Sequence, residues 1–285
     1  MNPTRTVLLT ALALVAFAAN SLLCRVALGR DLIDPASFTS IRLIAGAGML
    51  LLIQGIVKRR WGAAGGSWAS ASFLFLYAVA FSFAYRSLSA GTGALILFAG
   101  VQATMMLAAL RAGERPDPQK WIGIITASAG LVYLVSPGLQ APTPIGALLM
   151  TVAGVAWGAY SLLGRTSVDP IFDTAGNFMR SVPFALAVSM VALRSTGITG
   201  HGALLAAVSG AITSGAGYVI WYAALSALST AQAATAQLLV PVLAAVGGVL
   251  FLAEGLTLRL VLSSILILGG VGLGLVGRSI QRGTK

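Results

Sequence analysis

Long apolar stretches alternate with short clusters of charged and turn-forming residues along most of this chain. An apolar run of about 20 residues is long enough to cross the hydrocarbon core of a bilayer as a helix. The longest run is interrupted only by Arg86, and we divide it at the small, polar segment 87–93. The pattern predicts ten transmembrane helices, at 6–28, 35–57, 68–87, 90–111, 118–136, 144–165, 173–193, 202–225, 229–252 and 257–277.

The chain also contains an internal repeat. One offset of 140 residues aligns Ser21 with Ser161, Arg25 with Arg165, Leu88 with Leu228, Ser89 with Ser229, Glu114 with Glu254, and Gly130 with Gly270. Because the motif at 21–25 recurs at 161–165, we expect the first apolar segment to be a permanent helix and not a cleaved signal peptide. The repeat predicts two five-helix units, 1–139 and 140–285.

An odd number of helices in each unit has a topological consequence. The second unit must enter the membrane from the opposite side, so the two units form an inverted-topology repeat related by a pseudo-two-fold axis in the membrane plane. This arrangement is common in secondary transporters, whose substrate sites lie between the repeats. The predicted fold class is therefore an all-α integral membrane protein with ten helices around a central cavity.

Composition agrees with this class. Hydrophobic residues make up 58% of the chain, charged residues only 9%, and the mean hydropathy is +0.93; soluble domains carry roughly a quarter charged residues. With a cytoplasmic N-terminus, eleven of the 18 basic residues fall in cytoplasmic segments and five outside. The net charge of +11 therefore reflects membrane topology and not nucleic-acid binding, and we expect a bacterial inner-membrane protein with both termini in the cytoplasm.

The sequence offers little for catalysis or metal binding. Cys24 is the only cysteine and His201 the only histidine, which excludes an internal disulfide and leaves no cluster of soft metal ligands. Neither an HExxH or CxxC motif nor a phosphate-binding glycine loop is present. We therefore expect a protein that is not an enzyme and holds neither a metal nor a cofactor.

At this point the residues resemble a known family. The run PVLAAVGGVLFLAE at 241–254, the glycine-rich 269–272 and a weaker first copy with Glu114, Gly123 and Gly130 resemble the EamA-type transporters of the drug/metabolite transporter superfamily. Overall similarity is greatest to the bacterial aromatic amino acid exporters. The resemblance implies a monomer with a central pathway that opens alternately to each side. Val101 replaces Pro241 in the first copy, so a proline hinge would operate in one half only.

Two arginines, Arg42 and Arg180, fall inside predicted helices, and intramembrane charges are candidate functional groups. Each could bind a substrate carboxylate or a moving ion; alternatively, each could bond helix-end carbonyls or extend to the lipid headgroups. We expect no acid inside a helix, because Asp173, at the boundary of the seventh range, is assigned to the preceding loop and Glu254 lies at a helix end. Glu254 could be a gate, or it could tie a helix end to a loop amide or to an arginine such as Arg259.

Aromatic and small polar residues share helical faces in both repeats, as expected for a surface that contacts an amphipathic solute. Such faces could also serve only helix packing. The glutamine at 237 lies one turn before Pro241, which would free nearby backbone carbonyls. The candidate substrate contacts are Phe17, Asn20, Ser21, Tyr77, Phe81, Trp157, Tyr160, Ser161, Tyr218, Trp221 and Gln237; the candidate gate or ion contacts are Arg42, Arg180, Pro241 and Glu254.

These features predict a transporter that exports large neutral, aromatic and other zwitterionic amino acids by alternating access. The missing intramembrane acid favours a facilitator, because exchange of lipophilic cations for protons needs an embedded carboxylate. The alternative is export of drugs or other metabolites by the same superfamily, with possible proton coupling. The expected partners are a small-molecule substrate and the lipid bilayer.

Overall fold

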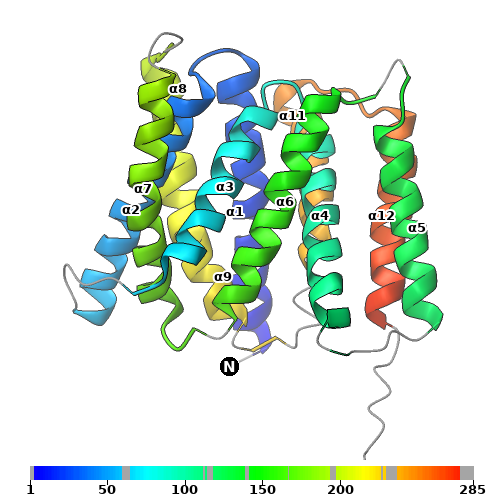
Figure 1. The fold of residues 1–285 in the computed structure, drawn as a ribbon, viewed down its shortest axis with the longest axis horizontal. Helices are drawn as coiled ribbons and strands as arrows, with labels where there is room; N and C mark the ends of the chain where they lie inside the picture. The colour runs from blue at the N-terminus through cyan, green and yellow to red at the C-terminus, as the bar shows by residue number, and fades with distance from the viewer. Residues whose placement is uncertain are drawn as a thin grey trace, which may run out of the picture.

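The computed structural model describes residues 3–59, 65–111, 113, 118–138, 141–165, 167–192, 197–225, 227–228 and 236–276. Within these ranges the chain is almost entirely helical (Figure 1), which confirms the predicted fold class. The elements are α1 Pro3–Gly29, α2 Pro35–Lys58, α3 Trp68–Ala84, α4 Ala90–Arg111, α5 Pro118–Val135, α6 Pro144–Gly164, α7 Pro170–Val191, α8 Gly200–Val208, the π-helix η2 Ser209–Ala216, α9 Gly217–Leu225, α11 Leu239–Leu252 and α12 Leu258–Val276.

Side-chain caps explain where several helices begin. A side-chain oxygen accepts a hydrogen bond from an early backbone amide at five helix starts, formed by Asp34, Ser67, Thr143, Asp169 and Thr199. Proline follows the cap in α2, α6 and α7, where its missing N–H costs nothing. These short polar sequences produced the interruptions between the apolar runs.

Three details differ from the sequence-based ranges. Because Asp169 caps α7, that helix begins at Pro170, and Asp173 lies in its first turn instead of in a loop. The expectation that every acid lies outside the helices is therefore wrong for Asp173. The eighth segment is not a uniform α-helix, since the π-helix η2 separates α8 from α9. In the ninth, a turn at Leu238 separates the helical residues 236–237 from α11, which begins at Leu239; residues 229–235 lie outside the described part.

The two halves of the chain interlock. The most extensive contacts join a helix of the first half to one of the second: α5 packs on α12, α4 on α11, α3 and α4 on α6, α2 on α7 and η2, α3 on α7, and α1 on α9 and α11. Exchanging each helix for its counterpart in the other half leaves this list unchanged, as a pseudo-two-fold axis requires. In Figure 1, α1 and α6 run in opposite directions along the bundle, which agrees with an inverted second half.

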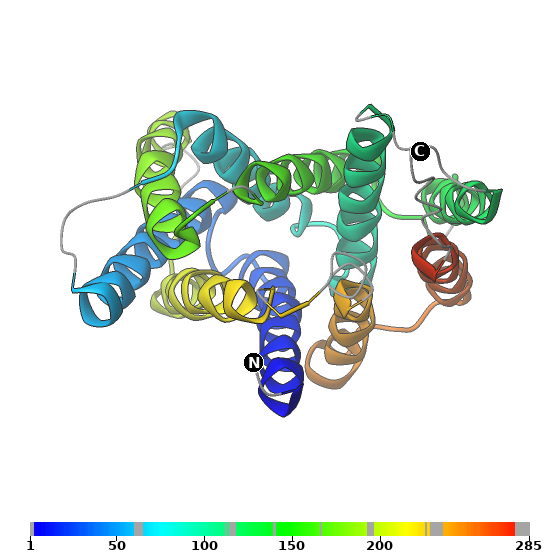
Figure 2. The ribbon, with the colours of Figure 1, turned by 90° about the horizontal axis from the view of Figure 1, so that it is seen from below.

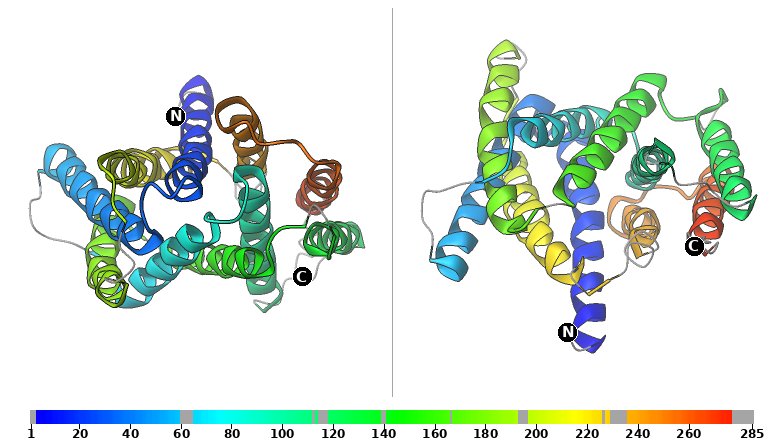
Figure 3. Two further views of the ribbon diagram at one scale, coloured as in Figure 1. Left: turned by 90° about the horizontal axis from the view of Figure 1, so that it is seen from above. Right: turned by 60° about the horizontal axis from the view of Figure 1, so that its bottom comes forward.

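The α5–α12 pair stands at one end of the molecule, beyond α4 and α11, as Figures 2 and 3 show. The other helices surround the centre, with α2 and α7 at the opposite end. Among the described residues, five segments are long and apolar enough to cross a bilayer: α1, α2, α4, α6 and the continuous Gly200–Leu225. Most of the others are shorter apolar helices packed against them, so the chain is a multi-pass membrane protein.

Close helix approaches depend on two glycines. A Cβ atom on Gly154 of α6 would lie 2.4 Å from the Leu97 carbonyl oxygen of α4. A Cβ atom on Gly210 of η2 would lie 2.0 Å from the carbonyl oxygen of Arg42 in α2. Small residues at such crossings let backbones approach closely in membrane bundles, and here they draw α4 and η2 inward around the centre.

A candidate substrate cavity between the two halves

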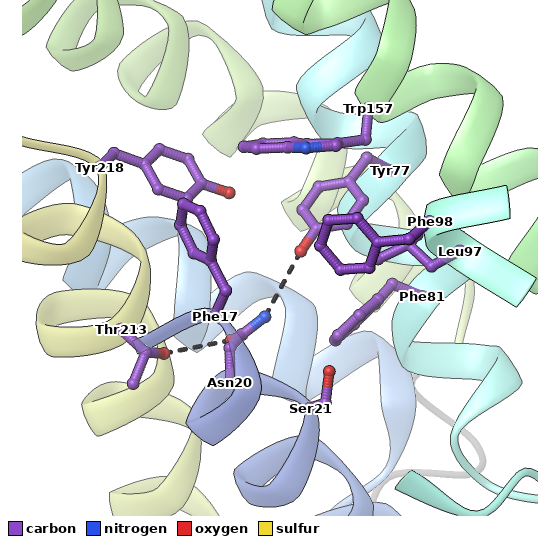
Figure 4. Close-up of a pocket in the computed structure, with 10 residues that line it drawn as sticks. All are labelled: Phe17, Asn20, Ser21, Tyr77, Phe81, Leu97, Phe98, Trp157, Thr213 and Tyr218. Atoms are coloured by element: carbon purple, nitrogen blue, oxygen red, sulfur yellow. Dashed lines mark hydrogen bonds between the residues drawn. The ribbon is translucent and has the colours of Figure 1, made fainter. Parts of the chain in front are cut away.

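A small cavity lies at the centre of the bundle, between helices of both halves (Figure 4). Its volume is about 20 Å³, which is enough for a single water molecule. Its walls come from α1, α3, α4, α6, η2 and α9, and the lining residues are Phe17, Asn20, Ser21, Tyr77, Phe81, Leu97, Phe98, Trp157, Thr213 and Tyr218.

Aromatic rings form most of the wall. The ring of Phe17 packs edge-on against Trp157 and Tyr218, with centroids 6.4 and 6.0 Å apart. The indole of Trp157 also lies 5.0 Å from the rings of both Tyr77 and Tyr218. Figure 4 shows these rings converging from α1, α3, α6 and α9. They occupy the space that a ligand would need, so this conformation is contracted around its centre.

A chain of polar groups crosses the floor of the cavity. Asn20 Oδ1 accepts hydrogen bonds from the hydroxyls of Ser209 at 2.7 Å and Thr213 at 3.2 Å. Asn20 Nδ2 donates to the phenol oxygen of Tyr77 at 3.4 Å (Figure 4). The amide thus joins α1 to α3 and to η2. A π-helix inside a longer helix is frequent at functional sites, and here it carries both hydroxyl donors.

Arg42 extends this series of hydrogen-bonded polar groups beneath the aromatic wall. The residue is only 1% exposed, so extension to the headgroups, one of the interpretations open from the sequence, is wrong for Arg42. Nε donates to Ser214 Oγ at 3.2 Å and Nη2 to the Tyr77 phenol oxygen at 3.0 Å. The guanidinium carbon lies 5.1 Å from the ring centroids of both Tyr77 and Phe81, as in cation–π contacts.

The two intramembrane arginines occupy different environments. Arg180, on α7, bonds the backbone carbonyl of Gly65, and its guanidinium carbon lies 5.9 Å from the ring centroid of Trp68. Asp173 and Asn177 on the same face of α7 accept hydrogen bonds from the next two backbone amides of the segment before α3, at 2.8 and 3.0 Å. Arg180 therefore fastens a connecting segment to α7, which agrees with the carbonyl-bonding reading.

Glu254 lies at the end of the bundle opposite the N-terminus and connects three segments there. Its Oε1 accepts a hydrogen bond from Arg25 Nε at 2.9 Å, and its Oε2 from the backbone amide of Ala90 at 2.8 Å. Arg25 also donates to the carbonyls of Tyr85 and Arg86. We call these contacts the Arg25–Glu254 latch, because they join the ends of α1, α3 and α4 to the segment after α11.

The partner of Glu254 in the latch differs from the expected one. Arg259 does not pair with Glu254, because its guanidinium bonds the carbonyls of Leu134 and Ser136 at the end of α5. Glu114, the counterpart of Glu254 in the first half, lies outside the described residues. Glu254 bonds an arginine, as one sequence-based reading held, but that arginine is Arg25. The amide that donates to Glu254 belongs to Ala90, the first residue of α4, and not to a loop.

Seven of the eleven candidate substrate contacts line the cavity: Phe17, Asn20, Ser21, Tyr77, Phe81, Trp157 and Tyr218. The other four do not. Tyr160 and Trp221 are buried behind it, 5.5 Å from the Trp157 ring and 5.7 Å from the Phe17 ring respectively. The Ser161 hydroxyl bonds the Trp157 carbonyl within α6. Gln237 is buried immediately before the turn at Leu238, and Pro241 lies in the first turn of α11.

Sequence reasoning missed three lining residues. Leu97 and Phe98 belong to the uniformly apolar start of α4, where no pattern separated cavity-facing from packing positions. Thr213 lies on the π-helix, whose wider turn changes which positions share a face. The cluster of serine, threonine and glycine at 209–215 was the available signal.

A second, larger cleft of about 290 Å³ lies between α4, α5 and α12. Its lining is mostly aliphatic, with Trp121 and Gln102 among the few exceptions. It lies beside the peripheral α5–α12 pair and contains no charged residue among those that line it. The central cavity, in contrast, combines rings, an amide and hydroxyl groups, and the buried guanidinium of Arg42 lies next to it.

Comparison with known proteins agrees with this architecture. The model of the EamA-like transporter family matches the chain twice, at residues 4–136 and 144–275. The chain belongs to the EamA-like transporter family. The two matches correspond to the two interlocked halves, and this family membership indicates membrane transport of a small molecule.

Several relatives resemble this EamA-like chain over most of its length. "Uncharacterized protein PA1977" of Pseudomonas aeruginosa is 47% identical across 99% of the chain and 100% of that protein. "Uncharacterized transporter YoaV" of Bacillus subtilis is 23% identical across 84% of the chain and 86% of that protein. A solved structure described as "Crystal structure of protein" has a TM-score of 0.66 and 18% identity, over 96% of this chain and 99% of that one, which supports the fold alone.

Proposed function

We propose that this EamA-like protein exports large neutral, aromatic and other zwitterionic amino acids by alternating access. The observation that supports this proposal is the composition of the central cavity, where aromatic rings from five helices surround the Asn20 amide and the Thr213 and Tyr77 hydroxyls. Rings supply contact area for an apolar side chain, and a few fixed polar groups orient the ligand. In this proposal Phe17, Trp157 and Tyr218 contact the substrate side chain.

Charge around the cavity favours a zwitterion over a cation. The residues that line the cavity include no carboxylate, while the guanidinium of Arg42 touches the lining residues Tyr77 and Phe81 from behind. A lipophilic cation in a site of low dielectric would be repelled by this charge and would find no acid to neutralise its own. Because no carboxylate lines the cavity to carry a proton, the composition also supports a facilitator that is driven by the substrate gradient.

The small cavity volume fits an intermediate of a transport cycle. Ligand pockets usually have volumes of about 300–1,000 Å³, far above the 20 Å³ enclosed here. A substrate would enter only when the rings on α1, α6 and α9 separate. We propose that the repeats 1–139 and 140–285 provide this movement, with the turn before Pro241 as a hinge and the Arg25–Glu254 latch as a gate.

We also propose an orientation in the membrane. The start of α1 and the end of α12 lie at the same end of the bundle in Figure 1, opposite the latch. With the basic residues near these ends in the cytoplasm, both termini are cytoplasmic in a bacterial inner membrane. The latch then closes the outer side of the cavity.

Transport by purified protein in liposomes tests the proposal. Uptake and counterflow are measured with labelled phenylalanine, leucine, a quaternary ammonium compound and a sugar. We expect saturable uptake and counterflow of the amino acids, without stimulation by a pH gradient. Flux that does not saturate would indicate a channel, and exchange of the cation without the amino acids would overturn the substrate assignment in favour of drug export.

A further inference from the structure

Tyr77 occupies a special position in the polar floor of the cavity. Its phenol oxygen lies 3.0 Å from Arg42 Nη2 and 3.4 Å from Asn20 Nδ2, and both nitrogens donate. The orientation of the Asn20 amide follows from Ser209, whose hydroxyl donates to its oxygen at 2.7 Å. The Thr213 hydroxyl lies 3.2 Å from the same oxygen and shares its proton with the Ser209 carbonyl. Two donors therefore converge on the single oxygen of Tyr77.

This arrangement determines what Tyr77 can offer a ligand. A phenol has one proton to donate and two lone pairs to accept with. Both lone pairs are engaged by donors, and none of the hydrogen bonds among the described residues uses the Tyr77 proton. Since Tyr77 lines the cavity, its O–H is a donor for a group inside it. An adjacent guanidinium strengthens such a donor by withdrawing charge from its oxygen.

Arg42 also requires negative charge nearby. It is almost fully buried, yet no carboxylate of the described residues lies within salt-bridge distance of it. Its Nη1 has no hydrogen-bond partner in that part of the chain, whereas Nε and Nη2 each have one. An uncompensated buried cation is costly, and an anion in the cavity would reduce that cost.

We propose that Tyr77, with Arg42 behind it, recognises the carboxylate group of the transported molecule. The Tyr77 hydroxyl donates directly to a carboxylate oxygen, and the Arg42 guanidinium supplies the compensating charge through the phenol and from its free Nη1. The inference rests on the proposed function for its amino acid substrates, but the recognised chemistry is the carboxylate. The ammonium group is left to the ring faces of Trp157 and Tyr218, where cation–π contact is available.

Binding measurements can separate the two proposals. We would titrate purified protein in detergent with L-phenylalanine, with L-phenylalaninamide, which lacks the carboxylate, and with 3-phenylpropionate, which lacks the ammonium group. The variant Tyr77→Phe removes the donor and keeps the ring. Tyr85→Phe is the matched control, because Tyr85 is equally buried at the end of the same helix but donates to the Ala90 carbonyl and does not line the cavity.

We expect phenylalanine and 3-phenylpropionate to bind and the amide to bind roughly 10- to 100-fold more weakly, as for loss of one hydrogen bond to a charged group. Tyr77→Phe should lower the affinity for both carboxylate ligands by a similar factor and leave the affinity for the amide unchanged. Tyr85→Phe should change none of the three affinities. Equal binding of the amide and phenylalanine, or an equal effect of Tyr77→Phe on all three ligands, would overturn this inference alone.

Other outcomes distinguish the failure of the proposed function. Binding of 3-phenylpropionate without phenylalanine, lost in Tyr77→Phe, would support carboxylate recognition and overturn amino acid transport. Absence of binding by all three ligands to the wild-type protein would overturn both. A Tyr77→Phe protein that elutes as a monodisperse species and binds the amide like the wild type is folded, so its loss of carboxylate affinity has a local cause.

Discussion

Arg25 Nε lies 2.9 Å from Glu254 Oε1, although 229 positions separate the two residues in the chain. The contact ties the C-terminal part of α1 to the segment after α11, and Glu254 also accepts a hydrogen bond from the Ala90 amide at the start of α4. One carboxylate thus holds together α1 and α4 of the first repeat and the segment after α11 of the second. The single cysteine, Cys24, is fully buried directly beside Arg25 and can report on this closure.

Glu254→Gln should open the latch. The neutral amide loses the charged hydrogen bond to Arg25, which is worth roughly 1.5–3 kcal/mol, so we expect Cys24 to react with a bulky maleimide about tenfold faster or more than in the wild type. Alkylation of purified protein, followed by mass spectrometry, measures the rate. Asp31→Asn is the control, because its pair with Arg86 at the same end of the molecule is exposed and long, at 3.6 Å. Equal rates in Glu254→Gln and Asp31→Asn would contradict a closing role.

Asn20→Asp should replace the substrate's charge by one from the protein. The new carboxylate would face both Tyr77 and the hydroxyls of Ser209 and Thr213. There it would accept a hydrogen bond from the Tyr77 hydroxyl and compensate the charge of Arg42. We expect transport and binding of phenylalanine to fall at least tenfold. In Asn20→Ser, which keeps a small polar group without charge, transport and binding should fall less. Equal losses in both variants would show that the Asn20 amide itself, and not the charge, matters.

Arg42 and Arg180 should respond differently to the same substitution. Arg42→Gln removes the charge beneath the cavity, so affinity for phenylalanine should fall roughly 10- to 100-fold. Arg180→Gln loosens only the segment before α3, because its guanidinium bonds the Gly65 carbonyl there, so its affinity should stay within about twofold of the wild type. Calorimetric titration of both variants checks this, and a similar loss in Arg180→Gln would mean that the α7 face also reaches the substrate.

The ten helices could be predicted from the sequence because helix ends in this chain are chemically explicit. Asp34 with Pro35, and Thr143 with Pro144, are cap-and-proline pairs that mark the starts of α2 and α6. The start of α7 was misplaced by three residues because Asp173 was read as a loop residue, although an acid in the first turn is typical of a helix start.

The cavity could be predicted only in part. Helical spacing placed Phe17, Asn20 and Ser21 on one face, and all three line the cavity. The same spacing could not show that Arg42 is buried under Tyr77, because depth depends on how α2 packs against η2 and not on position along α2. The latch was missed for a similar reason, since the partner of Glu254 is a long-range contact that no local pattern encodes.

Gly210→Ala should test how much the site depends on the close approach of η2 to α2. A Cβ atom there would lie 2.0 Å from the Arg42 carbonyl oxygen, so the two helices must separate. Overpacking of this kind costs about 1–3 kcal/mol, more than the roughly 1 kcal/mol that alanine gains over glycine in a helix. We expect a lower Tm in detergent and weaker phenylalanine binding, because Ser214 would no longer hold Arg42 Nε. Gly48→Ala is the matched control on α2: nothing lies within 4 Å of its Cβ position, so its Tm should be unchanged or slightly raised. If Gly210→Ala matched this control in both Tm and affinity, the position of Arg42 would not depend on the packing of the π-helix.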